Sequence, residues 1–435
     1  MKQVRGFTTK ISNLNKDEEN HLNQLFGINR LIWNICLGYR KELWETYKRR
    51  NPCIENKDEL KLINSLGSSV NIQKELSKKK IQQLDEYDFL LTCPAKAIQQ
   101  CVRKLDTTYK KFYKGQGGYP KFKKKSGLNS IHLDSSGKVN KVNKKYIKIT
   151  TNKMSFIVKN PIRDNKIFEE DTKICSITLS RKPNGIYYIS VNYSYEVGEI
   201  KKVKINKEKA IGIDRGVTTT ATCSNGKEFN IDQKEMNKIN DRIKFYQKQM
   251  SKKKKGSNNR NKIRIKIAKL HNKKSNIKKD FNHKLSHYLV KSHDLIVMEN
   301  LKIKNMTKSS KGTQDNHGSM VKQKSGLNRS ILENNWGQLK EMVAYKSELY
   351  GKHFVLVNPK NTSRRCSNCS HVEKDNRSGK TFHCLHCGHK MDADINASIN
   401  IKEDGLSLLA CGENSLEISK PSMKRKQELE TTLKV

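Results

Sequence analysis

Acidic side chains are scarce in this sequence. Asp and Glu number 43 among 435 residues, against 88 Lys and Arg, and the formal net charge is +45. A positive field of that size exceeds what solubility requires and attracts polyanions, so nucleic acid is the partner that we expect. A membrane surface is the rival polyanion, but no apolar run approaches the ~18 residues of a spanning helix, so we expect no membrane partner.

A signal peptide is also missing, because the N-terminal residues have no apolar core. This absence predicts a cytoplasmic protein, in which thiols stay reduced. Seven of the eleven cysteines are isolated in the sequence and are interpreted as small buried hydrophobic residues: Cys36, Cys53, Cys93, Cys101, Cys175, Cys223 and Cys411.

The other four cysteines form two close pairs. Cys366-x-x-Cys369 and Cys384-x-x-Cys387 are separated by fourteen residues. Each pair places two sulfurs on one tight turn, and two facing turns close a tetrahedral site, so the spacing predicts a structural zinc ion in a zinc ribbon. The alternative of four unrelated core cysteines does not account for the pairing.

The first half of the sequence predicts strands interrupted by helices. Residues 3–12 alternate as in a strand, and 14–18 resemble a capping box that starts a helix. Pro94 is expected as a first helical residue. Two apolar stripes at helical spacing predict a bundle core: Leu22, Leu25, Phe26, Ile32, Trp33 and Cys36, and then Ala97, Ile98, Cys101, Leu105, Thr108, Tyr109 and Phe112.

At residues 117–125 glycine and proline end the helical pattern, and lysines alternate with aromatics. Lys121 and Lys123 are therefore candidate phosphate contacts, with the rings available to bases or sugars. Strands follow from 130 to 196, and a hairpin is predicted at Lys182–Gly185. This order suggests a small barrel interrupted by helices.

The second half alternates strands and helices. A strand at 211–217 carries Asp214 and is expected to continue toward Cys223, and a strand at 294–301 carries Glu299. Further predictions are a helical hairpin at 233–292, a mobile loop at 304–328, a helix at 331–350, a strand at 353–357, a short helix at 396–401 and a disordered segment after it. The stretch from Ser251 to Asp280 holds thirteen basic residues and one acid, a bias typical of a phosphate-binding face; its candidate contacts are Lys253, Arg260 and Arg264.

Three acids in this half point to metal-dependent chemistry. Neighbouring strands could bring Asp214 and Glu299 side by side, and Asp394 would join them from the start of a helix. Such a cluster is too negative to remain empty, and two Mg²⁺ ions about 4 Å apart would neutralise it and act on a phosphodiester. Taken singly, each acid could instead cap a helix or form a surface ion pair. A nearby fourth acid, Asp392, fits this simpler role best.

These residues carry a resemblance to TnpB, the nuclease family encoded by insertion sequences and ancestral to compact type V CRISPR effectors. Its split RuvC motifs resemble Gly212–Gly216, Met298–Leu301, Asn361–Ser363 and Asp392–Ala397, together with the four-cysteine module, Gly118–Lys123 and Ala410–Glu413. Ser370 departs from the family's usual glycine and Ser398 from its usual alanine.

The resemblance implies a multidomain α+β fold. It consists of a wedge β-barrel (1–15 and 116–205), a helical recognition insert (16–115), an RNase H-like RuvC nuclease domain (206–361 and 393–404, with the basic hairpin 233–292), an inserted zinc ribbon (362–392) and a disordered tail (405–435).

The resemblance also implies an RNA-guided DNA endonuclease. A structured guide RNA from the element's own end would be bound, a short motif beside the double-stranded target DNA would be read, and one site would cut both strands. Asp214, Glu299 and Asp394 would be the catalytic magnesium ligands, and a monomer is favoured over a homodimer. A strand-transferring transposase, a guide-directed repressor that does not cut and a zinc-ribbon adaptor remain alternatives.

Overall fold

The computed structural model describes residues 2–51, 57–81, 89–125, 127, 129–134, 137–151, 154–161, 166–312 and 316–410. The chain divides into two compact units, the first made of residues 1–198 and 256–268 and the second of residues 199–255 and 269–435. Cys53, Cys411 and the predicted disordered segment from 411 onward lie outside the described residues. No described helix is long and apolar enough to cross a membrane.

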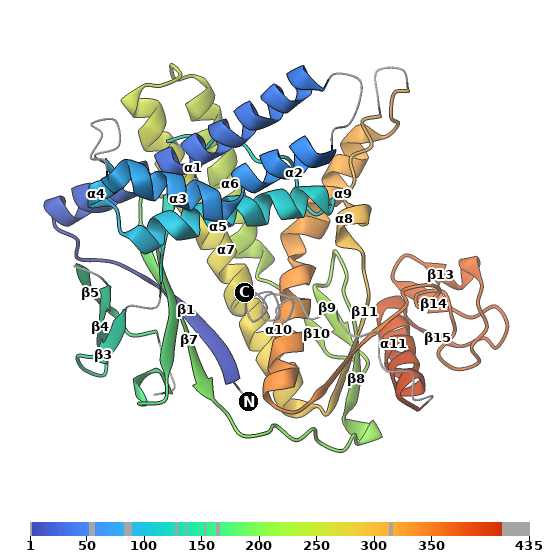
Figure 1. The fold of residues 1–435 in the computed structure, drawn as a ribbon. Coiled ribbons are helices and arrows are strands. Elements are labelled where there is room, and N and C mark those ends of the chain that lie inside the picture. The colour runs from blue at the N-terminus through green and yellow to red at the C-terminus, as the bar shows by residue number, and fades with distance from the viewer. Residues whose placement is uncertain are drawn as a thin grey trace. The chain divides into compact units, whose positions relative to one another are not determined.

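Two antiparallel sheets make up the strands of the first unit (Figure 1), in the orders β1-β7-β6-β2 and β3-β4-β5. Their bounds are β1 Lys2–Lys10, β2 Asn129–Asp134, β3 Lys138–Lys141, β4 Tyr146–Thr151, β5 Met154–Lys159, β6 Lys173–Arg181 and β7 Tyr187–Glu196. The predicted hairpin is confirmed, because Lys182 N–H donates to Ile186 O at 3.0 Å. Closure of these strands into a barrel stays a prediction.

The helices of the first unit are α1 Lys16–Arg50, α2 Lys57–Leu66, α3 Ser69–Ile81, α4 Phe89–Thr92 and α5 Ala95–Tyr113, followed by the 3-10 turn η2 Lys166–Phe168. The capping box before α1 is confirmed, with Asn15 and Glu18 each accepting from the other's backbone N–H. Two expectations are wrong. Pro94 is the N-cap of α5 and not its first residue, and Phe112 lies on the exposed side of α5, outside the buried stripe.

The second unit is built on a five-stranded sheet in the order β10-β9-β8-β11-β12. Its strands are β8 Ala210–Asp214, β9 Ala221–Cys223, β10 Glu228–Phe229, β11 Leu295–Glu299 and β12 His353–Val357. The central strands β8, β11 and β12 are parallel. The expected continuation of β8 toward Cys223 is wrong, because the chain turns after Asp214 and β9 returns antiparallel to β8.

Helices cover both faces of this sheet, which explains why its central strands are continuously apolar. Residues on one face, such as Ile211 and Ile296, pack with Leu285 of α7 and Leu339 of α10. On the other face, Ala210, Leu295 and Val297 pack with Ile401 of α11. Gly212 lets α11 approach closely, since a Cβ there would lie 2.1 Å from the Ser398 carbonyl oxygen.

The helices of the second unit are α6 Gln233–Ser251, α7 Asn258–Ser292 (whose first residues belong to the first unit), α8 Ile303–Met306, α9 Val321–Asn334, α10 Trp336–Leu349 and α11 Ala393–Ala410, with 3-10 turns η3 Lys207–Lys209 and η4 Lys374–Asn376. The two helices predicted between 233 and 292 are confirmed. The loop predicted at 304–328 is wrong at both ends, because α8 covers its first residues and α9 covers it from Val321 onward. The single helix predicted from 331 is broken at Asn335, whose φ of 56° is left-handed.

Strands β13 Arg377–Ser378, β14 Thr381–His383 and β15 Lys390–Asp392 form a small antiparallel sheet beside α11 (Figure 1). Helix α11 is much longer than the predicted 396–401. It continues to Ala410, so the disorder expected from 405 is wrong for its first six residues. The reason is packing: a Cβ at Gly405 would lie 2.4 Å from Val297, so this part of α11 presses on the sheet.

Candidate active site and metal centre

Two of the predicted acids stand at one edge of the sheet in the second unit. Asp214 ends β8 and Glu299 ends β11, and these strands are parallel neighbours with Met298 paired to Ile213. Because side chains alternate along a strand, both carboxylates point to the face that α11 covers. Asp394 lies in the first turn of α11. The fold therefore brings Glu299 and Asp394 close enough to Asp214 for their charges to act on it.

Asp214 is buried and is repelled by the other two acids. Burial, followed by the negative charges of Glu299 and Asp394, raises the pKa of Asp214 to about 7. Burial also raises the pKa of Glu299. Ionising Asp214 and Glu299 therefore costs free energy unless cations come close, which is the electrostatic condition for a metal site.

One cation already reaches this cluster from the small sheet. Arg377, at the start of β13, donates from Nη2 to Asp394 Oδ1 at 2.8 Å, and both side chains are mostly buried. A divalent cation would have to share Asp394 with this guanidinium or displace it. Sequence reasoning missed Arg377, because a single arginine in the spacer between two cysteine pairs gives no pattern.

Glu299 is held by two buried neighbours. Thr362 Oγ1 donates to Glu299 Oε1 at 2.6 Å, and this threonine is only 2% exposed. The Arg215 guanidinium donates to the main-chain oxygens of Glu299 and Trp336. Burial lowers the pKa of Arg215 to about 10, so it stays charged at neutral pH and fixes the end of β11.

Asp392 has the capping role that the sequence favoured for it. Its Oδ1 accepts from the backbone N–H groups of Asp394 at 2.8 Å and of Ile395 at 3.1 Å. These bonds satisfy two of the free donors at the start of α11. Asp392 thereby fixes the helix turn that carries Asp394.

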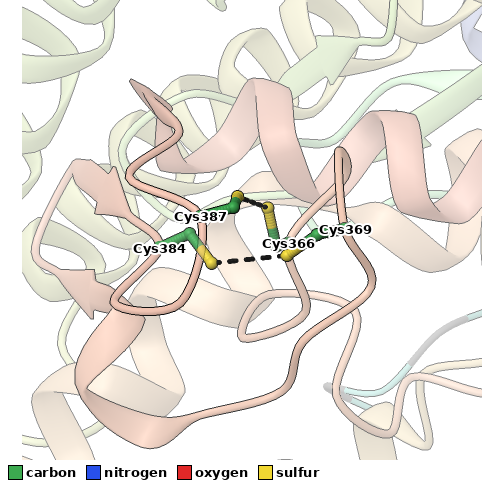
Figure 2. A group of neighbouring side chains, drawn as sticks. All are labelled: Cys366, Cys369, Cys384 and Cys387. Atoms are coloured by element: carbon green, nitrogen blue, oxygen red, sulfur yellow. Dashed lines mark hydrogen bonds between the residues drawn. The ribbon is translucent and has the colours of Figure 1, made fainter.

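The four paired cysteines come together as a ligand set. Figure 2 shows the two pairs facing each other, with Cys366 Sγ 3.7 Å from Cys387 Sγ and Cys369 Sγ 3.6 Å from Cys384 Sγ. All four sulfurs lie within 4.8 Å of one another, and no other such group occurs in the described part of the chain. Tetrahedral zinc with bonds of ~2.3 Å requires sulfurs about 3.8 Å apart, far beyond a disulfide bond. The residues therefore fit zinc.

The two cysteine turns have the same backbone structure. Cys366 N–H bonds to His371 O and Cys384 N–H to His389 O, both at 2.9 Å. After each pair comes a left-handed residue, Gly388 with a φ of 72° and Ser370 with a φ of 63°. The family's usual glycine at position 370 thus has a conformational reason, and Ser370 adopts the same conformation at a cost in strain.

Several side-chain contacts join the cysteine module to α11. Asn396 Nδ2 and Asn400 Nδ2 both donate to Arg365 O, at 2.8 and 2.7 Å. Asn400 Nδ2 also lies 2.9 Å from Thr362 O, and Arg365 pairs with Asp404 at 2.6 Å. Because Asp394 lies in the first turn of the same helix, these contacts tie the module to the helix that carries this acid.

The predicted nucleic-acid contacts lie in different surroundings. Lys121 is exposed in the loop after α5, whereas the Lys123 ammonium lies 3.8 Å from the centre of the Trp33 ring, where burial lowers its pKa to about 8. Lys253 is exposed between α6 and α7, and Arg260 and Arg264 lie near the start of α7. Their phosphate contacts stay a prediction, and Lys123 is already engaged with α1.

Three family models match parts of the chain. Residues 336–401 match a model described as "Cas12f1-like, TNB domain", residues 192–310 one described as "Probable transposase", and residues 13–49 one described as "Helix-turn-helix domain". The last description does not fit the local fold, since α1 runs through this segment as one unbroken helix.

Similar proteins cover most of the chain. A protein of Escherichia coli K12 named "Putative RNA-guided DNA endonuclease InsQ" is 33% identical over 75% of this chain and 79% of its own length. One of Streptomyces pristinaespiralis named "Putative RNA-guided DNA endonuclease" is 26% identical over 90% and 87%. A Cas12f1 in complex with sgRNA and target DNA shares the fold, with a TM-score of 0.55 at 13% identity over 92% of this chain and 99% of that one. The present chain matches InsQ over most of its length and also matches the transposase model. These matches show that this α+β chain of several domains belongs to the TnpB family of insertion-sequence proteins.

Proposed function

We propose that this protein is an RNA-guided DNA endonuclease. It binds a structured guide RNA from the end of its own element, reads a short motif beside the target and cleaves the DNA at a single site. The observation that carries the proposal is the convergence of Asp214, Glu299 and Asp394 in a chain whose formal charge is +45. Relatives whose names state this activity support it.

The domain assignment belongs to the same proposal. The nuclease domain is RNase H-like and of the RuvC type, formed by residues 206–361 and 393–404, with the zinc ribbon at 362–392. Parallel strands covered on both faces, with acids at their carboxyl ends, support this assignment. Strands β1 to β7 are proposed to belong to a wedge barrel, with residues 16–115 as its helical recognition insert.

Three side chains are proposed to hold magnesium: Asp214, Glu299 and Asp394. Hard carboxylate oxygens suit this ion, and two bound ions would supply an activated water and charge stabilisation for the leaving oxygen of a phosphodiester. The protein's own residues prepare the site. Thr362 orients the Glu299 carboxylate, and Arg377 balances charge at Asp394.

Guided cleavage is tested with protein purified from cells that carry the native locus. The bound RNA is sequenced, and a plasmid library matched to its 3′ end is incubated with the protein and Mg²⁺, beside a Glu299→Gln control. We expect cutting only of matched plasmids by the native protein, and none by the control. Tight DNA binding without cutting would replace the proposal by the guide-directed repressor.

A strand-transferring transposase is the second candidate, since the model matching residues 192–310 carries that description. Both chemistries use three acids and two metal ions, so the cluster does not separate them. The plasmid reactions described above separate the two activities, because a transferase joins the DNA ends that it produces. Joined products in the native reaction would favour the transposase.

The hydroxyl of Thr362 is expected to set magnesium affinity. Thr362→Val keeps the side-chain volume but leaves Glu299 Oε1 without its 2.6 Å donor. Loss of such a supporting hydrogen bond typically costs about 10- to 100-fold in metal affinity or activity. We expect a higher Mg²⁺ concentration for half-maximal cleavage in Thr362→Val and a nearly normal value in Thr362→Ser. Equal curves for the two variants would show that the hydroxyl does not orient the acid.

A further inference from the structure

Four aromatic side chains form an exposed patch on the first unit. Phe112 and Tyr113 end α5, and Tyr119 and Phe122 lie in the loop that follows. Their exposed fractions are 36%, 74%, 40% and 50%. The Phe112 ring centre is 5.5 Å from that of Tyr113 and 5.2 Å from that of Tyr119. Contiguous exposed rings of this kind mark an interaction surface.

The loop that carries two of these rings is fixed to α1. Trp33 Nε1 donates to Lys121 O at 3.0 Å. Asn34 bonds to the backbone of Lys123 in both directions, at 2.8 and 3.1 Å. The rings therefore stand on a support that is already in place, and a partner would not have to order them on binding.

Lysine side chains lie beside the patch. The Lys41 ammonium lies 5.7 Å from the centre of the Tyr119 ring and 4.9 Å from that of Phe122. Residues 110–125 contain seven lysines and no acid. The partner must therefore be a polyanion. Aromatic rings beside backbone-binding lysines are the arrangement that binds single-stranded nucleic acid, because every unpaired base offers a flat face for stacking. An acidic peptide offers carboxylates but no such series of rings.

We propose that Phe112, Tyr113, Tyr119 and Phe122 form a stacking platform for unpaired bases of the guide RNA, an assignment that rests on the proposed function. Two arguments favour RNA over target DNA. A structured RNA exposes unpaired bases in its loops, whereas a DNA duplex arrives with its bases stacked inside. A resident RNA also covers the rings between encounters with targets.

The test compares the RNA affinity of a variant that lacks aromatic rings with that of a variant that keeps them. Both are full-length proteins from which bound RNA has been removed at high salt. The probes are a labelled single-stranded RNA 12-mer, the RNA duplex and the DNA 12-mer of the same sequence. Stacking contributes about 1–3 kcal/mol per base. The Tyr113→Ala/Phe122→Ala variant is therefore expected to bind single-stranded RNA at least about tenfold more weakly, with an unchanged salt slope and unchanged duplex affinity. The Tyr113→Phe/Phe122→Tyr variant is expected to bind like the native protein.

Three results would overturn the platform: single-stranded RNA affinity within twofold of native, an equal loss for the duplex, or a loss confined to the DNA 12-mer. Unfolding temperature and Trp33 fluorescence check the fold, and the single Tyr113→Ala variant at the most exposed ring replaces the double variant if that one does not fold. Binding needs no cleavage, so the two proposals fail separately. If the protein cuts guided targets but its RNA affinity does not depend on the rings, only the stacking proposal is rejected. If its RNA affinity depends on the rings but it does not cut guided targets, only the nuclease proposal is rejected.

Discussion

Replacing Asp214 by asparagine is expected to abolish cleavage and to stabilise the magnesium-free protein. Loss of a metal ligand removes several kcal/mol of transition-state stabilisation, so we expect the cleavage rate to fall by about a thousandfold or more. Stability moves the other way. A carboxyl whose folded-state pKa is raised to about 7 costs the fold stability progressively as the pH rises from its unfolded pKa, and the full cost is present above the folded pKa.

The measurement is thermal unfolding at pH 8 in magnesium-free buffer without chelator, so that zinc is retained. Asp214→Asn is expected to gain roughly 2 kcal/mol, which is an increase of several degrees in unfolding temperature. Adding Mg²⁺ is expected to stabilise the native protein but not the variant. Asp241→Asn, at an exposed position on α6, is the matched control and is expected to change neither property. A variant less stable than the native protein in magnesium-free buffer would contradict the repulsion among the three acids.

The strands that carry the site were predictable because their signals are local. Continuous apolar runs predict β8 and β11, and a carboxylate inside such a strand is costly unless it meets a cation, which drew attention to Asp214 and Glu299. Side-chain alternation then directs both acids to one face. The order of the strands in the sheet, and hence which elements are neighbours, depends on packing between distant residues that no local pattern reveals.

The supporting residues could not be found in this way. Thr362 lies 63 residues from Glu299 in the sequence, and Arg377 is an ordinary polar residue of a spacer. Each acquires its contact only when the cysteine module folds onto α11. Helix α9 was missed for a related reason: only Ile331 and Asn334 are buried on it, so it has no apolar stripe to detect.

Replacing Cys384 by serine is expected to cause the other large loss. Cys384 is fully buried in a four-sulfur set, and small zinc modules draw most of their folding free energy, on the order of 10 kcal/mol, from the metal. We expect the variant to lose bound zinc and to cut guided targets at least about a hundredfold more slowly. Zinc content and cleavage are measured on the same samples. The control that keeps both is Cys175→Ser in β6, since Cys175 is exposed and the burial predicted for it is wrong.

The reason for this loss lies in the contacts between the module and the acids. Arg377 reaches Asp394 from β13, and Arg365 binds Asp404 and Asn400 on α11, so unfolding of the module releases the charge partner of one acid and the anchor of its helix. Thr362, which holds Glu299, is the first residue of the proposed zinc ribbon. Zinc would therefore affect DNA cleavage only by keeping the acids in position. Loss of zinc with undiminished cleavage would show that α11 and Thr362 hold the acids without the module.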